Sequence, residues 1–395
     1  MDPDWGHVLI LLFLLLPVAA YSGWWTAKRT FQRSANGYKR RLPPEYFKGL
    51  NYVLNEQPDK AIEVFIKMLE VDSETVETHL ALGNLFRRRG EVDRAIRIHQ
   101  NLIARPTLSH EERALALLEL GMDYMRSGLF DRAEGLFLEL VEDGSFTVQA
   151  FRQLLDIYQQ EKEWDEAIII ARRLESLSGE RQDAVIAQFH CELATGQVAA
   201  GRYNEARDNL RKALNLDSRC VRASLIEGEI ARKENKTRAA IKAYKRVEKQ
   251  DPEFLSEVVR PLRECYVDLG KSDEYIDYLK YLMDQYGGTT ALLSLADILS
   301  EVEGEVAAVE FMSSELRKRP TVYGVNRLLG YAISKADSGM RESLIMIKDM
   351  TGELLENRPI YKCNQCGFDA KHLHWRCPGC QNWNTVKPVY GVQGE

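Results

Sequence analysis

The sequence predicts an all-α protein in which a long solenoid of helix pairs connects one N-terminal transmembrane helix to a small C-terminal metal-binding ribbon. Three observations predict this arrangement. An uncharged apolar segment, LILLFLLLPVAA, lies near the N-terminus, small and large apolar residues recur through the middle, and two closely spaced cysteine pairs lie near the C-terminus. The predicted domains are residues 1–27 (membrane anchor), 28–48 (basic linker), 49–357 (solenoid) and 358–395 (metal-binding domain).

The composition is that of a folded chain, and its charge is unevenly distributed. Of the 395 residues, 45% are hydrophobic and 28% are charged, as in ordinary globular domains. Residues 1–48 carry a net charge of +4 and residues 358–395 carry +3, so the formal total of −6 leaves −13 for the middle. Because nucleic acids are bound through clustered Lys and Arg, an acidic middle argues against nucleic acid as the partner.

The first 27 residues form the predicted membrane anchor. Between Trp5 and Ala27 there is no Asp, Glu, Lys or Arg. A helix over residues 8–27 would be about 30 Å long, the thickness of the hydrocarbon core of a bilayer. A cleaved signal peptide is the alternative, but such peptides begin with basic residues, whereas this chain begins with Asp2 and Asp4. The sequence therefore favours an uncleaved anchor.

The linker contains all seven Lys and Arg residues of the first 48 positions. Basic residues remain on the cytoplasmic side of a membrane. We therefore expect a single-pass protein with its N-terminus outside and with the solenoid and the metal-binding domain in the cytoplasm. The linker either serves only as this topology signal or also lies against anionic lipid head groups, and the sequence leaves both open.

The solenoid is predicted from a small residue that recurs at spacings of 34, 38, 34, 39, 34 and 68, the last being twice 34. A second small residue often precedes it by 12 positions, and a larger apolar residue often follows it by four, as at Phe65 and Phe137. The recurring small residues are Ala61, Ala95, Ala133, Ala167, Ala206, Ala240 and Ala308.

This pattern resembles the tetratricopeptide repeat, a helix–turn–helix unit of 34 residues. Units such as ELGMDYMRSGLFDRAEGLFLELV place Gly and Asp between two helices, where one helix ends and the next begins. We expect about eight to nine helix pairs, extra loop residues at the two longer spacings, and a closing helix pair over residues 322–357. We expect the run Arg87–Arg89 to lie on a solvated helix face.

A solenoid of this kind leaves a concave face open to bind protein segments. The sequence contains no GxxxxGK[ST] phosphate loop, HExxH zinc motif or GxSxG nucleophile elbow. The solenoid is therefore predicted to bind partners and not to catalyse a reaction.

Four of the seven cysteines form the candidate metal site, and the odd total fits disulfides poorly. Cys363-x2-Cys366 and Cys377-x2-Cys380 are separated by ten residues. Each cysteine pair is expected to lie on a tight turn. Two such turns that face each other offer four sulfurs in a tetrahedron, which suits one zinc ion or one iron ion. The sequence thus predicts one structural zinc or iron ion, bound by these four cysteines in a reducing compartment.

A unit of about 35 residues is too small for a core of its own, so metal binding would supply its folding free energy. His372 and His374 are expected to orient the site or to lie on the surface. An iron form would resemble rubredoxin, an electron carrier, so a redox module is an alternative. We expect some aromatic residues of this unit to fix it to the C-terminal end of the solenoid; the candidates are Tyr361, Phe368, Trp375 and Trp383.

Together, the anchor, the repeat array and the terminal CNQCGF…WRCPGCQNWNT sequence resemble the lipopolysaccharide assembly protein B family (LapB, also called YciM) of Gram-negative bacteria over the full length. The resemblance implies a non-enzymatic adaptor in the bacterial inner membrane, with a periplasmic N-terminus, that restrains lipopolysaccharide synthesis. It also implies that the adaptor promotes proteolysis of the deacetylase LpxC by the membrane protease FtsH, and that a LapC-type inner-membrane regulator is a further partner. The metal ligands that it carries over are Cys363, Cys366, Cys377 and Cys380.

One alternative from another functional class stays open at this point. The chain could be a structural scaffold that docks lipopolysaccharide synthesis and transport proteins at the inner membrane. Lipopolysaccharide itself is a further candidate ligand.

Overall fold

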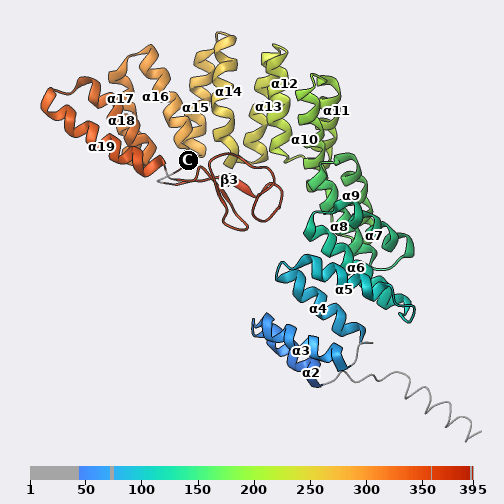
Figure 1. The fold of residues 1–395 in the computed structure, drawn as a ribbon. Coiled ribbons are helices and arrows are strands. Elements are labelled where there is room, and N and C mark those ends of the chain that lie inside the picture. The colour runs from blue at the N-terminus through green and yellow to red at the C-terminus, as the bar shows by residue number, and fades with distance from the viewer. Residues whose placement is uncertain (1–43, 72–74, 357, 392–393, 395) are drawn as a thin grey trace, which may run out of the picture. The chain divides into compact units, whose positions relative to one another are not determined.

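The computed structural model describes residues 44–71, 75–356, 358–391 and 394. Over these residues it contains eighteen α-helices, one short 3-10 helix and three short strands (Figure 1). The predicted anchor and most of the basic linker lie outside the described residues. In the part of the chain that is described, no helix is both long enough and apolar enough to span a bilayer.

The chain divides into two compact units, Met1–Ala150 and Phe151–Glu395. The helices of the first unit pack as consecutive pairs, α2 with α3, α4 with α5 and α6 with α7. The boundary between the two units falls within α8. The helix bounds up to this point are α2 (Pro44–Leu54), α3 (Pro58–Val71), α4 (Val76–Arg88), α5 (Val92–Ile103), α6 (His110–Ser127), α7 (Phe130–Asp143) and α8 (Thr147–Glu161).

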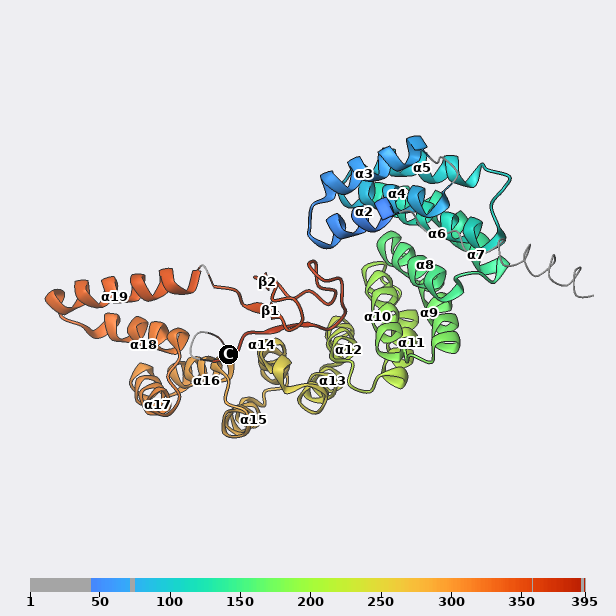
Figure 2. The same cartoon turned by 90° about the horizontal axis from the view of Figure 1, so that it is seen from below.

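The second unit continues the solenoid and ends with the small sheet. Its helices from α10 to α17 follow one another in an arc (Figure 2). The bounds are α9 (Trp164–Ser178), α10 (Asp183–Ala199), α11 (Tyr203–Leu216), α12 (Val221–Lys233), α13 (Thr237–Gln250), η1 (Pro252–Phe254), α14 (Leu255–Asp268), α15 (Ser272–Gln285), α16 (Thr289–Val302), α17 (Glu305–Lys318), α18 (Val322–Lys335), α19 (Ser338–Glu356), β1 (Tyr361–Cys363), β2 (Asp369–Ala370) and β3 (Val386–Pro388).

Within a helix pair, a glycine on the first helix lets the second helix approach closely. A Cβ atom added at Gly121 of α6 would lie 2.5 Å from the Phe137 ring of α7, and one added at Gly228 of α12 would lie 2.4 Å from the Tyr244 ring of α13. Both rings are buried. These are the small and large positions of the predicted repeat, so the predicted packing of the helix pairs is confirmed.

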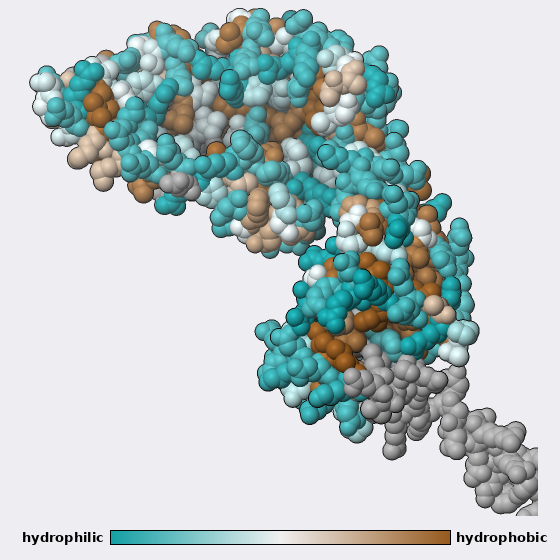
Figure 3. All heavy atoms as spheres, in the orientation of Figure 1, coloured by the Kyte–Doolittle hydropathy of each residue, from teal (hydrophilic) through white to brown (hydrophobic). Residues whose placement is uncertain are grey.

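The core of each unit therefore lies between neighbouring helices and not at a single centre. On the face drawn in Figure 3, hydrophilic side chains cover most of the helix surfaces, and hydrophobic side chains show mainly in the crevices between helices. This distribution is typical of a solenoid, because each helix pair buries its apolar surface against the next pair.

A buried histidine replaces the large apolar residue in one helix pair of the first unit. His99 of α5 is fully buried, and its Nδ1 lies 2.6 Å from Oδ2 of Asp123 in α6. The guanidinium of Arg87 donates to Asp123 at 2.8 Å and to Glu119 at 2.6 Å. The predicted solvated face over Arg87–Arg89 is therefore wrong for Arg87, because the buried Asp123 carboxylate requires a charged partner.

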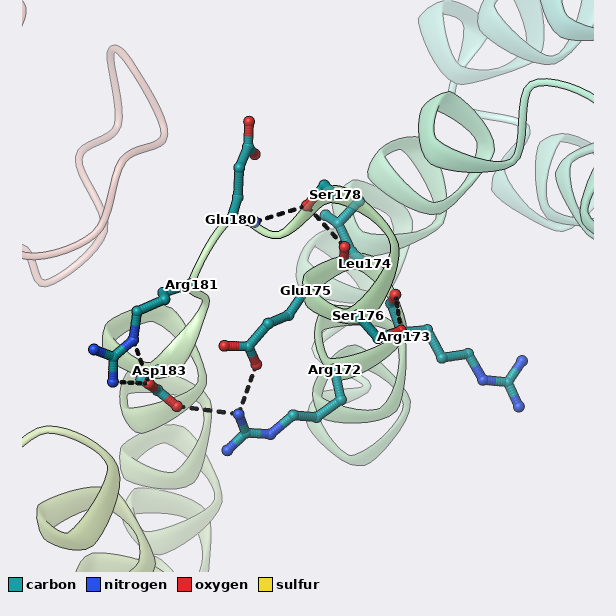
Figure 4. Close-up of polar contacts among 9 residues, drawn as sticks. All are labelled: Arg172, Arg173, Leu174, Glu175, Ser176, Ser178, Glu180, Arg181 and Asp183. Carbon is teal, nitrogen blue, oxygen red and sulfur yellow. Dashed lines mark hydrogen bonds and ion pairs between the residues drawn. The ribbon is translucent and has the colours of Figure 1, made fainter.

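The two longer repeat spacings are accommodated by longer helices as well as by loops. Residues 104–109 precede α6, which has 18 residues, and residues 179–182 precede α10, which has 17. Across the second loop, Arg172 donates to Glu175 at 2.7 Å and to Asp183, the first residue of α10, at 3.0 Å (Figure 4). This bridge links the end of α9 to the start of α10.

The last helix pair forms as predicted but packs differently. No residue of α19 is buried, and Met340, Met350 and Leu354 are 66%, 59% and 57% exposed. A Cβ added at Gly330 of α18 would meet Lys348 of α19 at 3.7 Å and not a large apolar side chain. The predicted closing helix pair over residues 322–357 is thus present as α18 and α19, with Lys348 opposite Gly330 where other pairs place a large apolar side chain.

The close approach at Gly121 is tested by adding one methyl group. We expect Gly121→Ala to lower the free energy of unfolding by about 1–3 kcal/mol, because the methyl group overlaps the Phe137 ring. The matched control is Gly135→Ala on α7, where nothing lies within 4 Å of the added Cβ; it should be neutral or stabilise by up to about 1 kcal/mol. Urea unfolding of both variants measures the difference, and equal stabilities would contradict this packing.

Candidate metal centre

The metal-binding domain is built on a three-stranded sheet in the order β2-β1-β3. The central strand β1 pairs antiparallel with both neighbours, and Cys363 lies opposite Val386 of β3. Cys363, Cys377 and Val386 are buried, and the Phe368 side chain packs against them. This cluster, with the neighbouring buried Ala370, is too small to hold the domain together without further links.

Each cysteine pair lies on a tight turn, and the two turns are built alike. The backbone N–H of Gly367 donates to the carbonyl of Cys363 at 3.0 Å, and that of Gln381 donates to Cys377 at 2.9 Å. Gly367 and Gln381 both have positive φ, at 77° and 61°. Gly379 leaves space for a metal ligand, because a Cβ there would lie 3.3 Å from the sulfur of Cys366.

The turns bring all four predicted sulfur ligands together. The four Sγ atoms lie within 4.8 Å of one another, with 3.7 Å between Cys363 and Cys380 and 3.6 Å between Cys366 and Cys377. An ion with metal–sulfur bonds of about 2.3 Å places tetrahedral ligands about 3.8 Å apart. The donor set therefore fits a single tetrahedral ion, and zinc and iron both accept this geometry.

The predicted histidines are not part of this cluster. Over the residues that the structure describes, the group of donors that could hold an ion there consists of cysteines alone. His372 is exposed, and the ring of His374 lies 6.2 Å from Phe368 in an edge contact.

Hydrogen bonds favour the thiolate form at two of the cysteines. Burial opposes ionisation of Cys363, but its hydrogen bonds with the Thr385 side chain and with the backbone N–H of Cys366 lower its pKa to about 6. Hydrogen bonds from the side chain and backbone of Asn382 lower the pKa of Cys380. The thiolate is the metal-binding form, so these donors favour metal binding at Cys363 and Cys380. At Cys366 the backbone N–H of Phe368 lowers the pKa, but burial and the neighbouring sulfurs outweigh it and raise the pKa to about 12, so an ion must displace that proton.

The first anchor of the ribbon on the solenoid is Trp383. Its Nε1–H donates to Oε1 of Gln159 in α8 at 2.8 Å. Its ring meets Trp164 of α9 and Phe189 of α10 edge-on, with centroids 6.1 Å and 5.8 Å apart. Arg376 adds a bond to the carbonyl of Gln159 at 3.5 Å. Aromatic side chains bury about 150–250 Å² each, so this contact is a substantial part of the docking energy.

The second anchor is Trp375, which stacks on Phe254 of η1 with ring centroids 5.5 Å apart. Arg222 of α12 lies 5.8 Å from the centre of the Trp375 ring. Lys387 lies 4.3 Å from the centre of the Phe254 ring and forms an ion pair with Asp251. Both partners of that ion pair are largely shielded from water, so it is screened less by salt than a surface pair.

Three further contacts extend the docking surface. The hydroxyl of Tyr361 donates to Glu257 of α14 at 2.7 Å, and that of Tyr390 donates to the carbonyl of Glu253 at 2.9 Å. At the C-terminal end of the domain, the Thr289 hydroxyl of α16 donates to the carbonyl of Gly394 at 2.9 Å. The aromatic anchors of the ribbon thus contact elements from α8 to α14, and the ribbon lies on the inner side of the arc (Figures 1 and 2). The predicted attachment to the C-terminal end of the solenoid is wrong, because α15–α19 continue beyond these anchors.

Sequence reasoning found the tryptophans of the ribbon but missed their partners on the solenoid. One signal was present in the sequence: Trp164 stands among charged residues in the stretch EKEWDEA. A large aromatic residue in such a polar stretch indicates a contact outside its own helix pair. Gln159 and Phe254 carry no comparable signal.

Comparisons with known proteins agree with both parts of the fold. Residues 361–388 match the family described as a rubredoxin metal binding domain, and residues 78–111, 118–181 and 191–253 match tetratricopeptide repeat families. The chain is 42% identical to lipopolysaccharide assembly protein B of Escherichia coli K12, over 98% of this chain and 100% of that protein. It is 37% identical to the protein of the same name from Haemophilus influenzae, over 96% and 98%. The C-terminal part of a repeat protein from Cytophaga hutchinsonii aligns with a TM-score of 0.39 at 15% identity, over 67% of this chain and 98% of that one.

The ligand assignment is tested by removing one thiol. We expect Cys377→Ser to lose most of the bound metal, because three thiolates and a hydroxyl form a much weaker site for zinc or iron. His372→Ala is the matched control in the same domain and should keep the metal. Metal content per chain, measured by mass spectrometry after gel filtration, gives the answer, and loss of metal in the histidine variant would overturn the four-cysteine assignment.

Proposed function

Because this chain belongs to the lipopolysaccharide assembly protein B family, we propose that it is a non-enzymatic adaptor of the bacterial inner membrane that regulates lipopolysaccharide synthesis. In this proposal it promotes proteolysis of the deacetylase LpxC by the membrane protease FtsH. The observation that supports an adaptor most directly is the docked ribbon, which joins a four-sulfur site to a helical binding surface. Four protein sulfurs leave no open position on a tetrahedral ion for a substrate, so we propose a structural role for the ion; the redox alternative requires iron and predicts a red protein that can be reversibly reduced.

The docked ribbon limits which part of the solenoid surface is open to a partner. Part of the inner face between α8 and α14 is occupied by the ribbon itself, so the concave face of this stretch is not an empty groove. We propose that LpxC is held by a composite surface made of the exposed side of the ribbon and the adjacent helices. Exposed ribbon residues include Gln365, Cys366 and Lys371.

The membrane anchor is proposed from the sequence of residues 1–27 and contributes through effective concentration. A tether confines the adaptor to the plane that contains FtsH, so binding LpxC also brings the substrate close to the protease. The anchor is also the proposed contact for a LapC-type inner-membrane regulator.

The proposal is tested by the lifetime of LpxC in cells. Deleting the chain should lengthen the half-life of LpxC several-fold. Trp383→Ala should approach the deletion, because it removes the ring contacts with Trp164 and Phe189 and the hydrogen bond to Gln159 that fix the ribbon. Trp383→Phe keeps the ring and should retain part of the activity, and His372→Ala should behave as wild type. Pulse-chase labelling measures the half-lives, with immunoblots to show equal adaptor levels.

An unchanged LpxC half-life in the deletion strain would remove the proteolysis role. A second candidate would then stand, a scaffold that docks lipopolysaccharide synthesis and transport proteins. The name of the relatives speaks of assembly and not of proteolysis, which favours this candidate. It predicts that transport proteins co-purify with the chain even from cells that lack FtsH.

A further inference from the structure

One stretch of the solenoid has a net positive charge, whereas the stretches on both sides of it have a net negative charge. Residues 202–250, which contain α11–α13, carry 14 Lys and Arg against 7 Asp and Glu, a net charge of +7. The flanking stretches 49–201 and 251–357 carry −11 and −9. Clustered cations in an otherwise acidic protein focus the electrostatic potential at one place. They indicate an anionic ligand that the total charge of the solenoid conceals.

Three of these cations, Arg207, Arg211 and Arg246, line a cavity between α11 and the next helix pair. The cavity has a volume of about 360 Å³. Its wall combines three guanidinium groups with two leucines, an amide, a hydroxyl and one carboxylate. The lining residues are Arg207, Leu210, Arg211, Leu214, Asn215, Ser218, Glu227 and Arg246. We call this cavity the α11–α13 groove.

Each of the three arginines has a carboxylate partner, and one of these carboxylates, Glu227, also lines the groove. Arg246 donates to Glu227 at 2.8 Å, and Arg207 forms an ion pair with Glu234. Arg211 lies 3.3 Å from Asp208, and the two side chains are 71% and 63% exposed. An exposed pair such as Arg211–Asp208 is weak, so a ligand can replace it at small cost.

Two lysines extend the cationic wall along α13. Lys242 and Lys249 lie four residues before and three residues after Arg246, so all three share one face of the helix. Both lysines are exposed. The groove is therefore bordered by cations from both helices.

The composition of the groove favours a phosphate ester over an acidic protein surface. Guanidinium forks bind phosphate oxygens in pairs. A concave site of a few hundred Å³ suits a small ligand, whereas protein partners cover broad surfaces. The single carboxylate, Glu227, would accept a hydroxyl or ammonium group, and Leu210 and Leu214 would contact an apolar part.

We propose that the α11–α13 groove binds a phosphate ester that carries a hydroxyl or ammonium group, either as a free molecule or as the head group of a phospholipid. This site is separate from the metal centre, and the proposal does not depend on the role in LpxC proteolysis.

The test uses the purified, metal-loaded full-length chain and one matched control. Arg211→Gln and Arg246→Gln each remove one guanidinium from the groove. Arg260→Gln is the control, because Arg260 on α14 is 89% exposed and is also paired with a carboxylate on its own helix, 3.4 Å away. Circular dichroism shows that the variants remain folded, and the exposure of Arg211 makes its variant the safer of the two.

Two measurements distinguish the sources of the phosphate. Broadening of the ³¹P signal of phosphoethanolamine, titrated with protein, reports a free ester. Amide hydrogen exchange over residues 203–216 and 237–250 reports a head group. It is compared between chains reconstituted in phosphatidylethanolamine–phosphatidylglycerol bilayers and chains in phosphate-free galactolipid bilayers, and slower exchange in the phospholipid bilayers indicates binding. We expect the wild-type chain to give at least one of these two signals. The affinity for the phosphate ester should fall about tenfold in Arg211→Gln and in Arg246→Gln and remain unchanged in Arg260→Gln.

Each outcome decides the proposal. Binding of phosphoethanolamine supports a free ligand, and protection only in phospholipid bilayers supports a head group. Absence of both signals overturns the proposal, as does binding that all three variants share. Tighter binding of a polyglutamate peptide than of phosphoethanolamine would also overturn it and would assign the groove to an acidic protein partner.

Discussion

The packing of two ribbon tryptophans against aromatic side chains of the solenoid is the contact on which the second unit depends. Trp383 fixes the ribbon to α8–α10, and Trp375 fixes it to η1. The ribbon has only a minimal apolar core, so its own shape depends on the ion that the four sulfurs are arranged to hold. The metal site and the solenoid are therefore coupled: the ion orders the ribbon, and the ordered ribbon joins two segments of the solenoid that are distant in sequence.

This coupling divides the surface of the second unit into parts with different roles. The inner face carries the docked ribbon, so a partner on that side meets helices and ribbon together. The cations of α11–α13 face a separate cavity lined by helix residues, and none of the four cysteines lines it. A repeat solenoid permits this separation, because each helix pair contacts mainly its neighbours and presents two largely independent faces.

The sequence was sufficient to predict what depends on local pattern. The helix pairs follow from the spacing of residues such as Gly121 and Phe137, the sulfur cluster follows from the two cysteine pairs, and the family resemblance is confirmed. The sequence was insufficient where contacts join distant residues. The partner of Trp383 is Gln159, more than 200 positions earlier, and no local pattern specifies that pairing.

The measurement that tests the central claim most directly is amide hydrogen exchange of the wild-type chain before and after removal of the metal with a chelator. The account predicts that exchange rises together in residues 164–199 and 252–268, the two segments that the ribbon joins, while residues 76–143 of the first unit are unchanged. If metal removal leaves exchange in both docking segments as it was, the ion does not support the solenoid, and the coupling described above is wrong.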